Sequence, residues 1–274
     1  AFEERLRSRD ASRTLHKAGG PSSESKADRE HHLVDENTGG TATKEDQLSR
    51  LREMGIQDIR VVDGGSSDKT VRVAKHFKAT VILSSQGRAI QMNAGAKASN
   101  KKILWFIHAD TLPPQQGAKK LLQSISKGNH LGCFRFKFDS NKPLLRLNSF
   151  MTRFNTLNFR GGDQGIFIKR AVFAQLKGFD EDYCIMEEYD FLKRAKSADL
   201  KFDLIADDML VSARKYKFNS YLRVNWANYK AMRSFHKGVS PEIIKKEYHQ
   251  MLNHPTEQRK VCDERTSKMS NGKL

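Results

Sequence analysis

Asp110 is the first candidate for chemistry, because it follows an apolar run that begins at Ile103. The run Ile103-Leu104-Trp105-Phe106-Ile107 has the composition of a strand that is buried on both faces of a parallel sheet. His108 and Asp110 come where this strand leaves the sheet, and ligands of open α/β sheets bind at that edge. A carboxylate there can hold a divalent cation against a phosphate-bearing ligand, although an ordinary strand end would look the same.

A second carboxylate, Asp63, ends a short strand pattern at residues 58–63. The following Gly64-Gly65-Ser66-Ser67-Asp68 permits a tight turn and a close approach of a ligand to the backbone. Asp63 could accept hydrogen bonds from a base or a ribose. Taken alone, an Asp-Gly turn with a capping serine explains the segment better. Two carboxylate-terminated strands joined by one helix nevertheless favour a shared ligand crevice.

Between these two strands, residues 87–96 predict a helix that begins after Gly87. Arg88, Gln91 and, less closely, Asn93 fall near one face of it. Polar groups at a helix start suit a sugar or a diphosphate, but a merely amphipathic helix would carry the same pattern.

The elements that must position these residues alternate along the chain. Strand patterns lie at 58–63, 80–84, 102–108, 132–138, 164–168 and 201–205, and helix patterns at 44–54, 68–78, 88–98, 115–127, 143–156, 170–176 and 187–198. This alternation predicts an α/β fold with a mostly parallel sheet covered by helices on both faces. After Tyr216 the pattern becomes helical, with aromatic residues interleaved with Arg223, Arg233 and Lys237. Such a segment can pack on its own domain or lie on a membrane surface.

Several motifs in this order resemble family 2 glycosyltransferases of the GT-A fold, and among them a bacterial-type group of glycosyltransferase 2-like proteins. The resemblance rests on Val-Val-Asp-Gly-Gly-Ser-Ser-Asp at 61–68, Gly-Arg-Ala-Ile-Gln-Met-Asn-Ala-Gly-Ala at 87–96, Phe-Ile-His-Ala-Asp-Thr at 106–111, Gly-Asp-Gln at 162–164, Gly-Phe-Asp at 178–180, Met-Glu-Glu-Tyr-Asp-Phe at 186–191 and Ser-Ala-Arg-Lys-Tyr at 212–216. It runs from about Ile59 to about Tyr248.

The resemblance implies transfer of a sugar, with inversion, from a nucleotide-diphosphate donor to an acceptor hydroxyl, assisted by Mg²⁺ or Mn²⁺. Asp110 is then the expected metal ligand and His108 a less certain one. Of the acidic pair Glu187-Glu188, the second member is the expected base. By themselves, adjacent acids at a helix start would only complement its dipole. The residues expected to contact the nucleotide or the sugar are Asp63, Gly64, Ser66, Asp68, Gly87, Arg88, Gln91, Asn93, Asp163, Gln164, Arg214 and Lys215.

The chain departs from the family at its start. Family members open with a buried strand that ends in a Pro-x-x-Asn-Glu-like motif, and residues 1–43 hold no such strand. Their polar composition predicts a disordered tail. The expected organisation is therefore a tail at 1–43, an N-terminally incomplete GT-A-like domain at 44–216, a helical C-terminal extension at 217–252 and a disordered basic tail at 253–274. Without the first strand, strand 58–63 or a neighbour should have an unpaired edge.

The composition limits the classes of molecule that this chain is expected to bind. The 274 residues include 49 Lys and Arg against 32 Asp and Glu, a formal net charge of +17 that attracts nucleotide diphosphates, acidic lipid headgroups or nucleic acid. No RNA-binding aromatic signature or zinc-finger spacing supports nucleic acid. Three widely spaced cysteines favour a reducing, cytoplasmic location. No apolar run approaches the length of a membrane span, so contact with a membrane or a lipid-linked acceptor would be peripheral.

Two other classes of protein stay open. One is a non-catalytic nucleotide-sugar-binding protein, since the absent first strand belongs to the family's nucleotide pocket. The other is a metal-dependent hydrolase that uses His108, Asp110 and the glutamates. The chain carries no Asp-x-Asp-x-Thr, Walker A or Gly-x-Gly-x-x-Gly motif, which disfavours other phosphate-handling classes.

Overall fold

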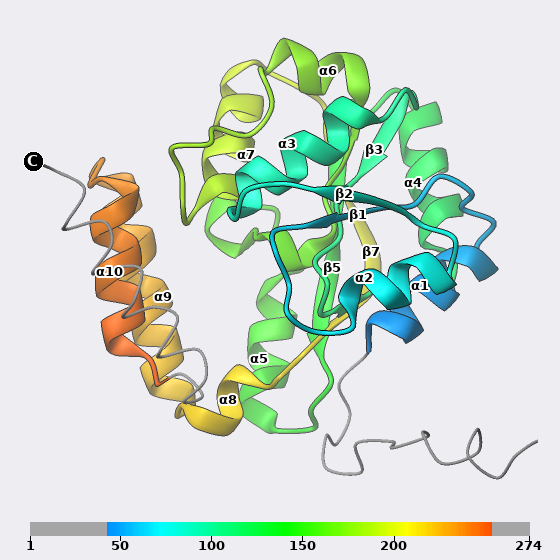
Figure 1. Ribbon diagram of the computed structural model, residues 1–274. Coiled ribbons are helices and arrows are strands. Elements are labelled where there is room, and N and C mark those ends of the chain that lie inside the picture. Colours follow the sequence, from blue (N-terminus) through cyan, green and yellow to red (C-terminus); the bar gives the residue numbers. More distant parts are fainter. Residues whose placement is uncertain (1–42, 254–274) are drawn as a thin grey trace, which may run out of the picture. The chain divides into compact units, whose positions relative to one another are not determined.

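The computed structural model describes residues 43–253 (Figure 1). Apart from Thr43 and Asn253, the two predicted tails lie outside these residues. None of the helices in the described part is long and apolar enough to span a membrane.

The strands of the described residues form two sheets. A two-stranded sheet joins β1 (Arg60–Asp63) to β2 (Thr80–Leu83) in parallel. The second sheet has the order β3-β6-β5-β7-β4, with β3 at Ile103–Trp105, β4 at Thr111–Leu112, β5 at Leu131–Phe138, β6 at Phe167–Lys169 and β7 at Phe202–Val211. The long pair β5–β7 is the centre of this sheet and contains a register shift between Phe134 and Arg135.

The expected α/β fold with a sheet flanked by helices is confirmed, but the sheet is not mostly parallel. Among the strands of the described residues, β1–β2 and β5–β7 are parallel, whereas β3–β6, β5–β6 and β4–β7 are antiparallel. The prediction failed because a continuous apolar run reports burial on both faces and carries no information on strand direction. The short strand β4, which follows Asp110 directly, has no pattern long enough to predict.

Ten α-helices and two short 3₁₀ turns of the described residues surround these sheets. They are α1 (Lys44–Glu53), α2 (Thr70–His76), α3 (Arg88–Ala98), α4 (Gly117–Ser126), α5 (Pro143–Met151), α6 (Arg170–Gln175), α7 (Glu187–Ser197), α8 (Lys215–Phe218), α9 (Tyr221–His236) and α10 (Pro241–Met251), with 3₁₀ turns at Leu157–Phe159 and Gly162–Gln164. The helix expected at 143–156 therefore ends early, at Met151, and the helical run after Tyr216 is confirmed as α9 and α10.

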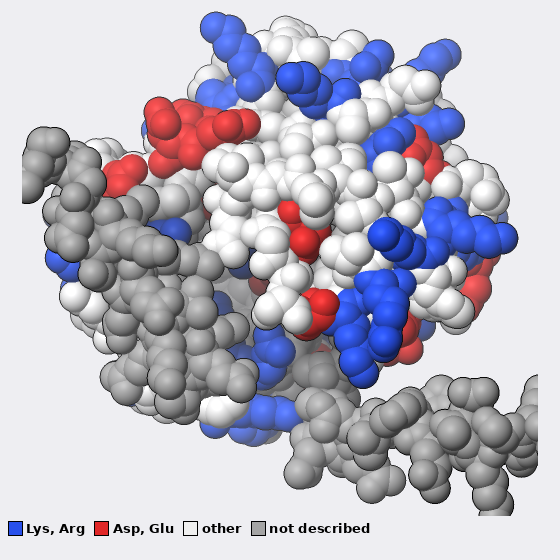
Figure 2. Space-filling model, viewed as in Figure 1, with Lys and Arg blue, Asp and Glu red and all other residues white. Residues whose placement is uncertain are grey.

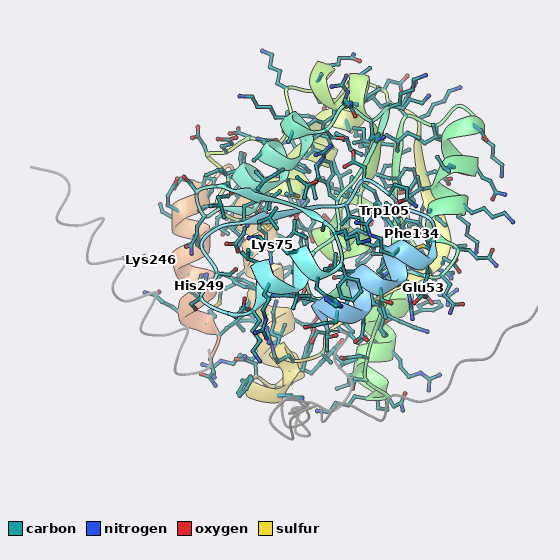
Figure 3. All side chains as sticks on the ribbon, turned by 45° about the vertical axis from the view of Figure 1, so that its right-hand side comes forward. Glu53, Lys75, Trp105, Phe134, Lys246 and His249 are labelled. Carbon is teal, nitrogen blue, oxygen red and sulfur yellow. The ribbon has the colours of Figure 1, made fainter. Side chains whose placement is uncertain are left out.

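Helices cover both faces of the larger sheet with apolar side chains. On one face, α3, α6 and α7 bury a cluster that includes Phe173, Phe179 and Phe191. On the other, Leu121 of α4 packs with a cluster around Phe134. Trp105 lies beside Phe134, with the ring centroids 5.5 Å apart (Figure 3). This packing fixes the strand ends that carry the candidate site.

Among the strands of the described residues, β1 is paired along one edge only, by β2. The carbonyls of Ile59 and Asp63 accept bonds from the β2 side, from Thr80 and Ser84. The carbonyl of Val62 points to the open edge, where the side-chain amide of Gln91 in α3 donates to it at 3.0 Å. A side chain thus satisfies one backbone group that a neighbouring strand would otherwise pair.

The C-terminal helices α9 and α10 pack against the segment that precedes α7. Their shared cluster holds Phe235 and Ile244 against Met186. α9 also reaches α5, because Asn148 bonds to Tyr221 and Asn225. The helical extension is therefore attached to the α/β unit beside the cleft described next.

Lys and Arg lie at many places over the face shown in Figure 2, whereas Asp and Glu gather in a few groups.

Candidate active site

A cleft of about 1690 Å³ collects most of the predicted site residues. One wall holds the turn after β1, the start of α3 and Asp110. The floor is formed by residues 160–163 and 186–189, and the opposite wall by side chains of α8, α9 and α10. The carboxyl ends of β1 and β3 thus meet at one crevice, as the two carboxylate-terminated strands predicted.

Asp63 is buried behind the first part of this wall and holds its backbone turn in place. Its carboxylate is 4 % exposed and accepts hydrogen bonds from the backbone N–H groups of Gly65 and Ser66. A hydrogen bond from the Ser66 side chain, with these backbone bonds, holds the pKa of Asp63 below its usual range although burial opposes this. Asp63 fixes the turn, and Gly64, Gly65 and Ser66 present the surface of the cleft.

The start of α3 forms the next part of the wall. Gly87 precedes the helix with a φ of 150°, a region that other residues rarely adopt. Arg88 and Gln91 line the cleft, and Arg88 places a guanidinium nitrogen 3.7 Å from Glu187. The free N–H groups of the first helical turn and this guanidinium together favour an anion.

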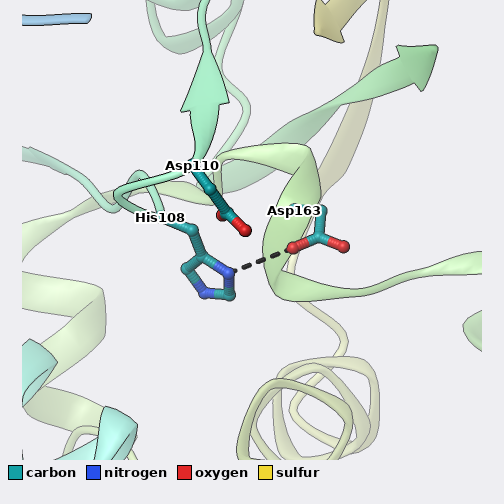
Figure 4. Close-up of side chains that lie close together, drawn as sticks. All are labelled: His108, Asp110 and Asp163. Carbon is teal, nitrogen blue, oxygen red and sulfur yellow. Dashed lines mark hydrogen bonds and ion pairs between the residues drawn. The ribbon is translucent and has the colours of Figure 1, made fainter. Parts of the chain in front are cut away.

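His108 lies beneath the cleft between two carboxylates. Its Nδ1 is 3.1 Å from Asp163 and its Nε2 is 3.0 Å from Glu188 (Figure 4 shows the Asp163 side). Burial by itself would lower the pKa of His108, but the hydrogen bonds to both carboxylates outweigh it and raise the pKa to about 10. His108 is therefore an imidazolium at neutral pH, donating from both nitrogens.

The two adjacent glutamates differ in charge state. Burial raises the pKa of Glu188, but the hydrogen bond from His108 outweighs it and leaves that pKa below its usual range. Burial and the nearby Glu188 charge raise the pKa of Glu187 to about 7. Both residues are almost fully buried, at 1 % and 3 % exposure, and follow Met186, whose φ of 68° is unusual for a residue other than glycine. Glu188 is thus the firmly ionised member of the pair.

Asp110 and Asp163 form a group of donors that fits a hard divalent cation. With His108, their ligand atoms lie within 4.8 Å of one another (Figure 4). Carboxylate oxygens are the ligands that Mg²⁺ and Mn²⁺ prefer. His108 is the weakest of the three donors, because an imidazolium has no lone pair to offer and would first have to lose a proton and one carboxylate partner.

Besides Asp63, three of the predicted binding residues lie elsewhere or are used internally. Asp68 pairs with Lys44 of α1 at 2.8 Å and is 60 % exposed outside the cleft. Asn93 exchanges hydrogen bonds with the backbone of Phe179 through both ends of its amide. Gln164 is fully buried and bonds to Arg160 and to the carbonyl of Phe159. Their amide and carboxylate chemistry suits a ligand, but the same groups hold loops, and the sequence does not distinguish the two uses.

Other polar side chains support the site without having been predicted. Arg160 is 4 % exposed and donates to the carbonyls of Thr152 and Phe154, so it ties the floor segment to the end of α5. Gln47 of α1 donates to the carbonyls of His108 and Thr111 on either side of Asp110. Arg214 and Lys215 were predicted and do line the cleft. Arg160 and Gln47 lie in segments that border loops and have no distinctive spacing along the chain. No sequence signal could therefore have identified them.

This fold and cleft define a class of proteins: enzymes of the GT-A type that bind a nucleotide sugar at the edge of an α/β sheet. The Glycosyl transferase family 2 sequence model matches residues 48–182 of the chain. No curated protein matches the chain.

Two solved structures of glycosyltransferases share the fold. S. aureus TarS 1–349 superposes with a TM-score of 0.50 at 13 % identity, over 68 % of this chain and 62 % of that one. The mannosyltransferase PcManGT from Pyrobaculum calidifontis, solved with GDP-Man and Mn²⁺, gives 0.51 at 17 % identity, over 75 % and 64 %. The chain thus spans less than two thirds of the length of each.

Proposed function

We propose that this chain transfers a sugar, with inversion and with the help of Mg²⁺ or Mn²⁺, from a nucleotide-diphosphate donor to an acceptor hydroxyl. The observation that carries the proposal is the ionised, buried Glu188 on the floor of the same cleft that holds Asp110 and the α3 helix start. The solved relative with GDP-Man and Mn²⁺ supports a donor of this class. A lipid-linked acceptor in the cytoplasm is compatible with the site.

In this proposal the donor diphosphate lies against the start of α3, where Arg88 and the Gly87 turn favour anions. Gly64, Gly65 and Ser66 contact the nucleoside, and Asp63 acts indirectly by holding that turn. Asp110 and Asp163 hold the cation, which offsets the charge of the departing diphosphate. His108 orients Asp163 and Glu188 by donating to both of them.

Glu188 accepts the proton of the acceptor hydroxyl as that oxygen attacks the anomeric carbon and the diphosphate leaves. A single displacement of this kind inverts the anomeric configuration. Glu187 lies beside it with a pKa near neutrality and faces Arg88, so it adjusts the charge of the floor rather than receiving the proton. Arg214 and Lys215, on the opposite wall, face the anionic groups of the bound substrates.

One observation favours a second candidate, a protein that binds a nucleotide sugar without turning it over. Within the described residues, one edge of β1 has no partner strand beside the turn that should contact the nucleoside, so these residues alone support that part of the pocket from one side. Capping of Val62 by Gln91 is a partial substitute for the strand.

A panel of nucleotide sugars, each with and without Mn²⁺ or Mg²⁺, separates the candidates. Release of nucleoside diphosphate that depends on an added acceptor supports the transferase. Release by water alone at the same rate supports a hydrolase. Calorimetric binding without turnover, for every donor and for a broad set of alcohol acceptors, would establish the non-catalytic protein instead.

A further inference from the structure

The exposed apolar side chains of the described residues gather on a few neighbouring helices. Eleven large apolar side chains are exposed, and only Leu83 and Leu122 lie away from these helices. The other nine are Leu144, Leu147, Phe150 and Phe154 on and just after α5, Phe218 on α8, Leu222, Trp226 and Tyr229 on α9, and Ile243 on α10. Monomeric proteins rarely leave apolar groups concentrated in this way unless the surface has a partner.

On α9 these side chains share one face. Leu222, Trp226 and Tyr229 are spaced by four and three residues, and Arg233 continues the row after four more. Val224 and Phe235, on the opposite face, are buried against the rest of the protein. Trp226 and Tyr229 stack with ring centroids 5.6 Å apart while each stays more than half exposed. The row is therefore an outward face of the helix and no part of the core.

α5 and α8 continue this surface. Asn148 bonds to Tyr216, Tyr221 and Asn225, which places α5 against the α8–α9 junction, as Figure 1 shows at the lower end of the molecule. Leu144 and Leu147 precede Asn148 in α5 by four residues and by one, and each is about half exposed. We call the exposed apolar side chains of α5, α8 and α9, with Phe154, the α5–α9 surface.

The charge of the α5–α9 surface has one sign. No Asp or Glu occurs between Asp208 and Glu242 or between Asp139 and Asp163. Besides the buried Arg160, those two stretches carry the basic residues Lys142, Arg146, Arg153, Arg214, Lys215, Lys217, Arg223, Lys230, Arg233 and Lys237. A second copy of the chain would bring like charges together across such a face, whereas an anionic bilayer complements it.

From these observations we propose that the α5–α9 surface docks on an anionic lipid bilayer. Amphipathic helices with Trp, Leu and Phe on one side and Lys and Arg beside them bind the headgroup region in this way, and Trp and Tyr favour that depth. The cleft is also lined by Phe218 and Tyr229 of this surface, and by Arg233, which continues the row on α9. Docking would therefore bring the mouth of the cleft to the headgroups, and the acceptor would be an amphiphile whose hydroxyl lies at the bilayer surface. This last step rests on the proposed function.

A matched pair of double variants tests the docking. Leu222→Ser with Trp226→Ser removes side chains that are 76 % and 60 % exposed on α9. Leu83→Ser with Leu122→Ser removes side chains that are 75 % and 54 % exposed elsewhere, and so matches the loss of apolar surface. The full chain and both variants are sedimented with phosphatidylcholine vesicles that contain or lack phosphatidylglycerol.

The full chain should sediment with the anionic vesicles, and only weakly with the neutral ones. The α9 variant should lose roughly tenfold or more in vesicle affinity, because two apolar anchors are removed, and the Leu83/Leu122 variant should bind like the wild type. Lys217→Glu with Lys230→Glu should also weaken binding, and Lys119→Glu on α4 with Lys127→Glu just after it should not. Trp226 should shift its fluorescence to shorter wavelength on vesicle binding, and the shift should vanish in Trp226→Phe.

The proposal would be overturned if the full chain did not bind vesicles. It would also be overturned if the α9 variant bound as well as the Leu83/Leu122 variant and the Lys217/Lys230 variant bound as well as the Lys119/Lys127 variant. Concentration-dependent self-association that only the α9 variant abolishes would assign the surface to a second copy instead. Binding of a nucleoside diphosphate with Mn²⁺, measured without lipid, keeps the two proposals apart. An α9 variant that binds nucleotide normally but not vesicles implicates the surface alone, whereas vesicle binding without any nucleotide binding would sink the transferase and leave the docking surface standing.

Discussion

The α/β wall of the cleft, taken together with the floor, differs from the helical wall in charge and in how firmly its side chains are held. On the α/β side, His108, Asp163 and Glu188 form a chain of hydrogen bonds in which the imidazolium is locked between two carboxylates. On the helical side, Tyr229 and Arg233 are exposed, and the polypeptide carries no acid between Asp208 and Glu242. The first arrangement suits chemistry, which needs charges fixed before the reaction. The second suits a partner that arrives from solution or from a surface.

The largest expected effect of a substitution in the α/β wall is at Glu188. If the fixed wall performs the chemistry, Glu188→Gln should lower the turnover number by roughly 10²–10⁴-fold while the donor affinity changes little, since the acceptor hydroxyl loses its base. Glu187→Gln should have a smaller effect. Steady-state rates with calorimetric donor binding measure both quantities. The reverse order of the two variants would move the base to Glu187.

Asp110 tests the same wall through the cation. Asp110→Ala should abolish the dependence of donor binding on Mn²⁺ or Mg²⁺, because the remaining donors, Asp163 and His108, are already hydrogen-bonded to each other. Titration of a nucleoside diphosphate with and without the ion gives the result directly. Asp58→Ala, which removes a carboxylate that pairs with Arg60 away from the cleft, is the control. An unchanged ion dependence in Asp110→Ala would remove Asp110 from the metal site.

Gly162 reports how tightly the fixed wall is packed. A Cβ on this residue would clash with Oε1 of Glu188 and with the His108 ring, whereas a Cβ on Gly161 would meet only the Tyr189 hydroxyl, at 3.6 Å. Gly162→Ala must therefore displace the pair, and we expect a rate loss on the order of 10²-fold, as for other small misplacements of catalytic groups.

Gly161→Ala is the matched control and should stay close to the wild-type rate. Far-ultraviolet circular dichroism should be unchanged in both variants, since neither glycine has a positive φ that alanine would strain. Equal rates for Gly161→Ala and Gly162→Ala would show that the His108–Glu188 contact does not matter for turnover.

The sequence predicted the site residues whose type is required at a particular backbone position, such as a strand end or a tight turn. It did not predict which polar side chains bond to other parts of the protein instead of lining the cleft. Asp110 and the Gly64–Ser66 turn were found because strand ends and glycines mark the edge of a sheet. Asn93 and Gln164 looked equally suitable, yet they hold loops. His108 was predicted as a less certain ligand, and the motif could not show the two carboxylates that approach it from Asp163 and Glu188.

The fold shows the same division. The positions of the helices followed from periodicity, and α3 occupies the predicted residues. Strand direction did not follow, because β6 lies antiparallel between β3 and β5 and an apolar run carries no signal for that direction. The open edge of β1 was anticipated from the absent first strand, but its cap, Gln91, was expected to face a ligand and in fact also bonds to Val62.

The pH dependence of the rate distinguishes the members of the acidic pair in the unmodified protein. The pKa of Glu188 is held below its usual range, so a Glu188 base stays ionised and the rate should be flat on the acid side down to about pH 5. The pKa of Glu187 is about 7, so a Glu187 base would give a rate that falls below neutrality. Saturating donor and acceptor are needed, so that the profile reports the enzyme–substrate complex.

The smallest effect is expected away from both walls, at the pair Lys44–Asp68 that ties α1 to the start of α2. The side chain of Lys44 lowers the pKa of Asp68 to about 2, so any stabilisation is present above the unfolded-state value near 4 and disappears as pH falls through about 2. Because Asp68 is 60 % exposed, solvent screening should reduce the coupling to roughly a few tenths of a kcal/mol. A double-mutant cycle with Lys44→Ala and Asp68→Asn, by urea unfolding at neutral pH and near pH 2, measures it. A coupling above about 1 kcal/mol, or one that persists at the lower pH, would mean that the contact is no ordinary surface ion pair, and that α1 is held more firmly against α2 than its exposure implies.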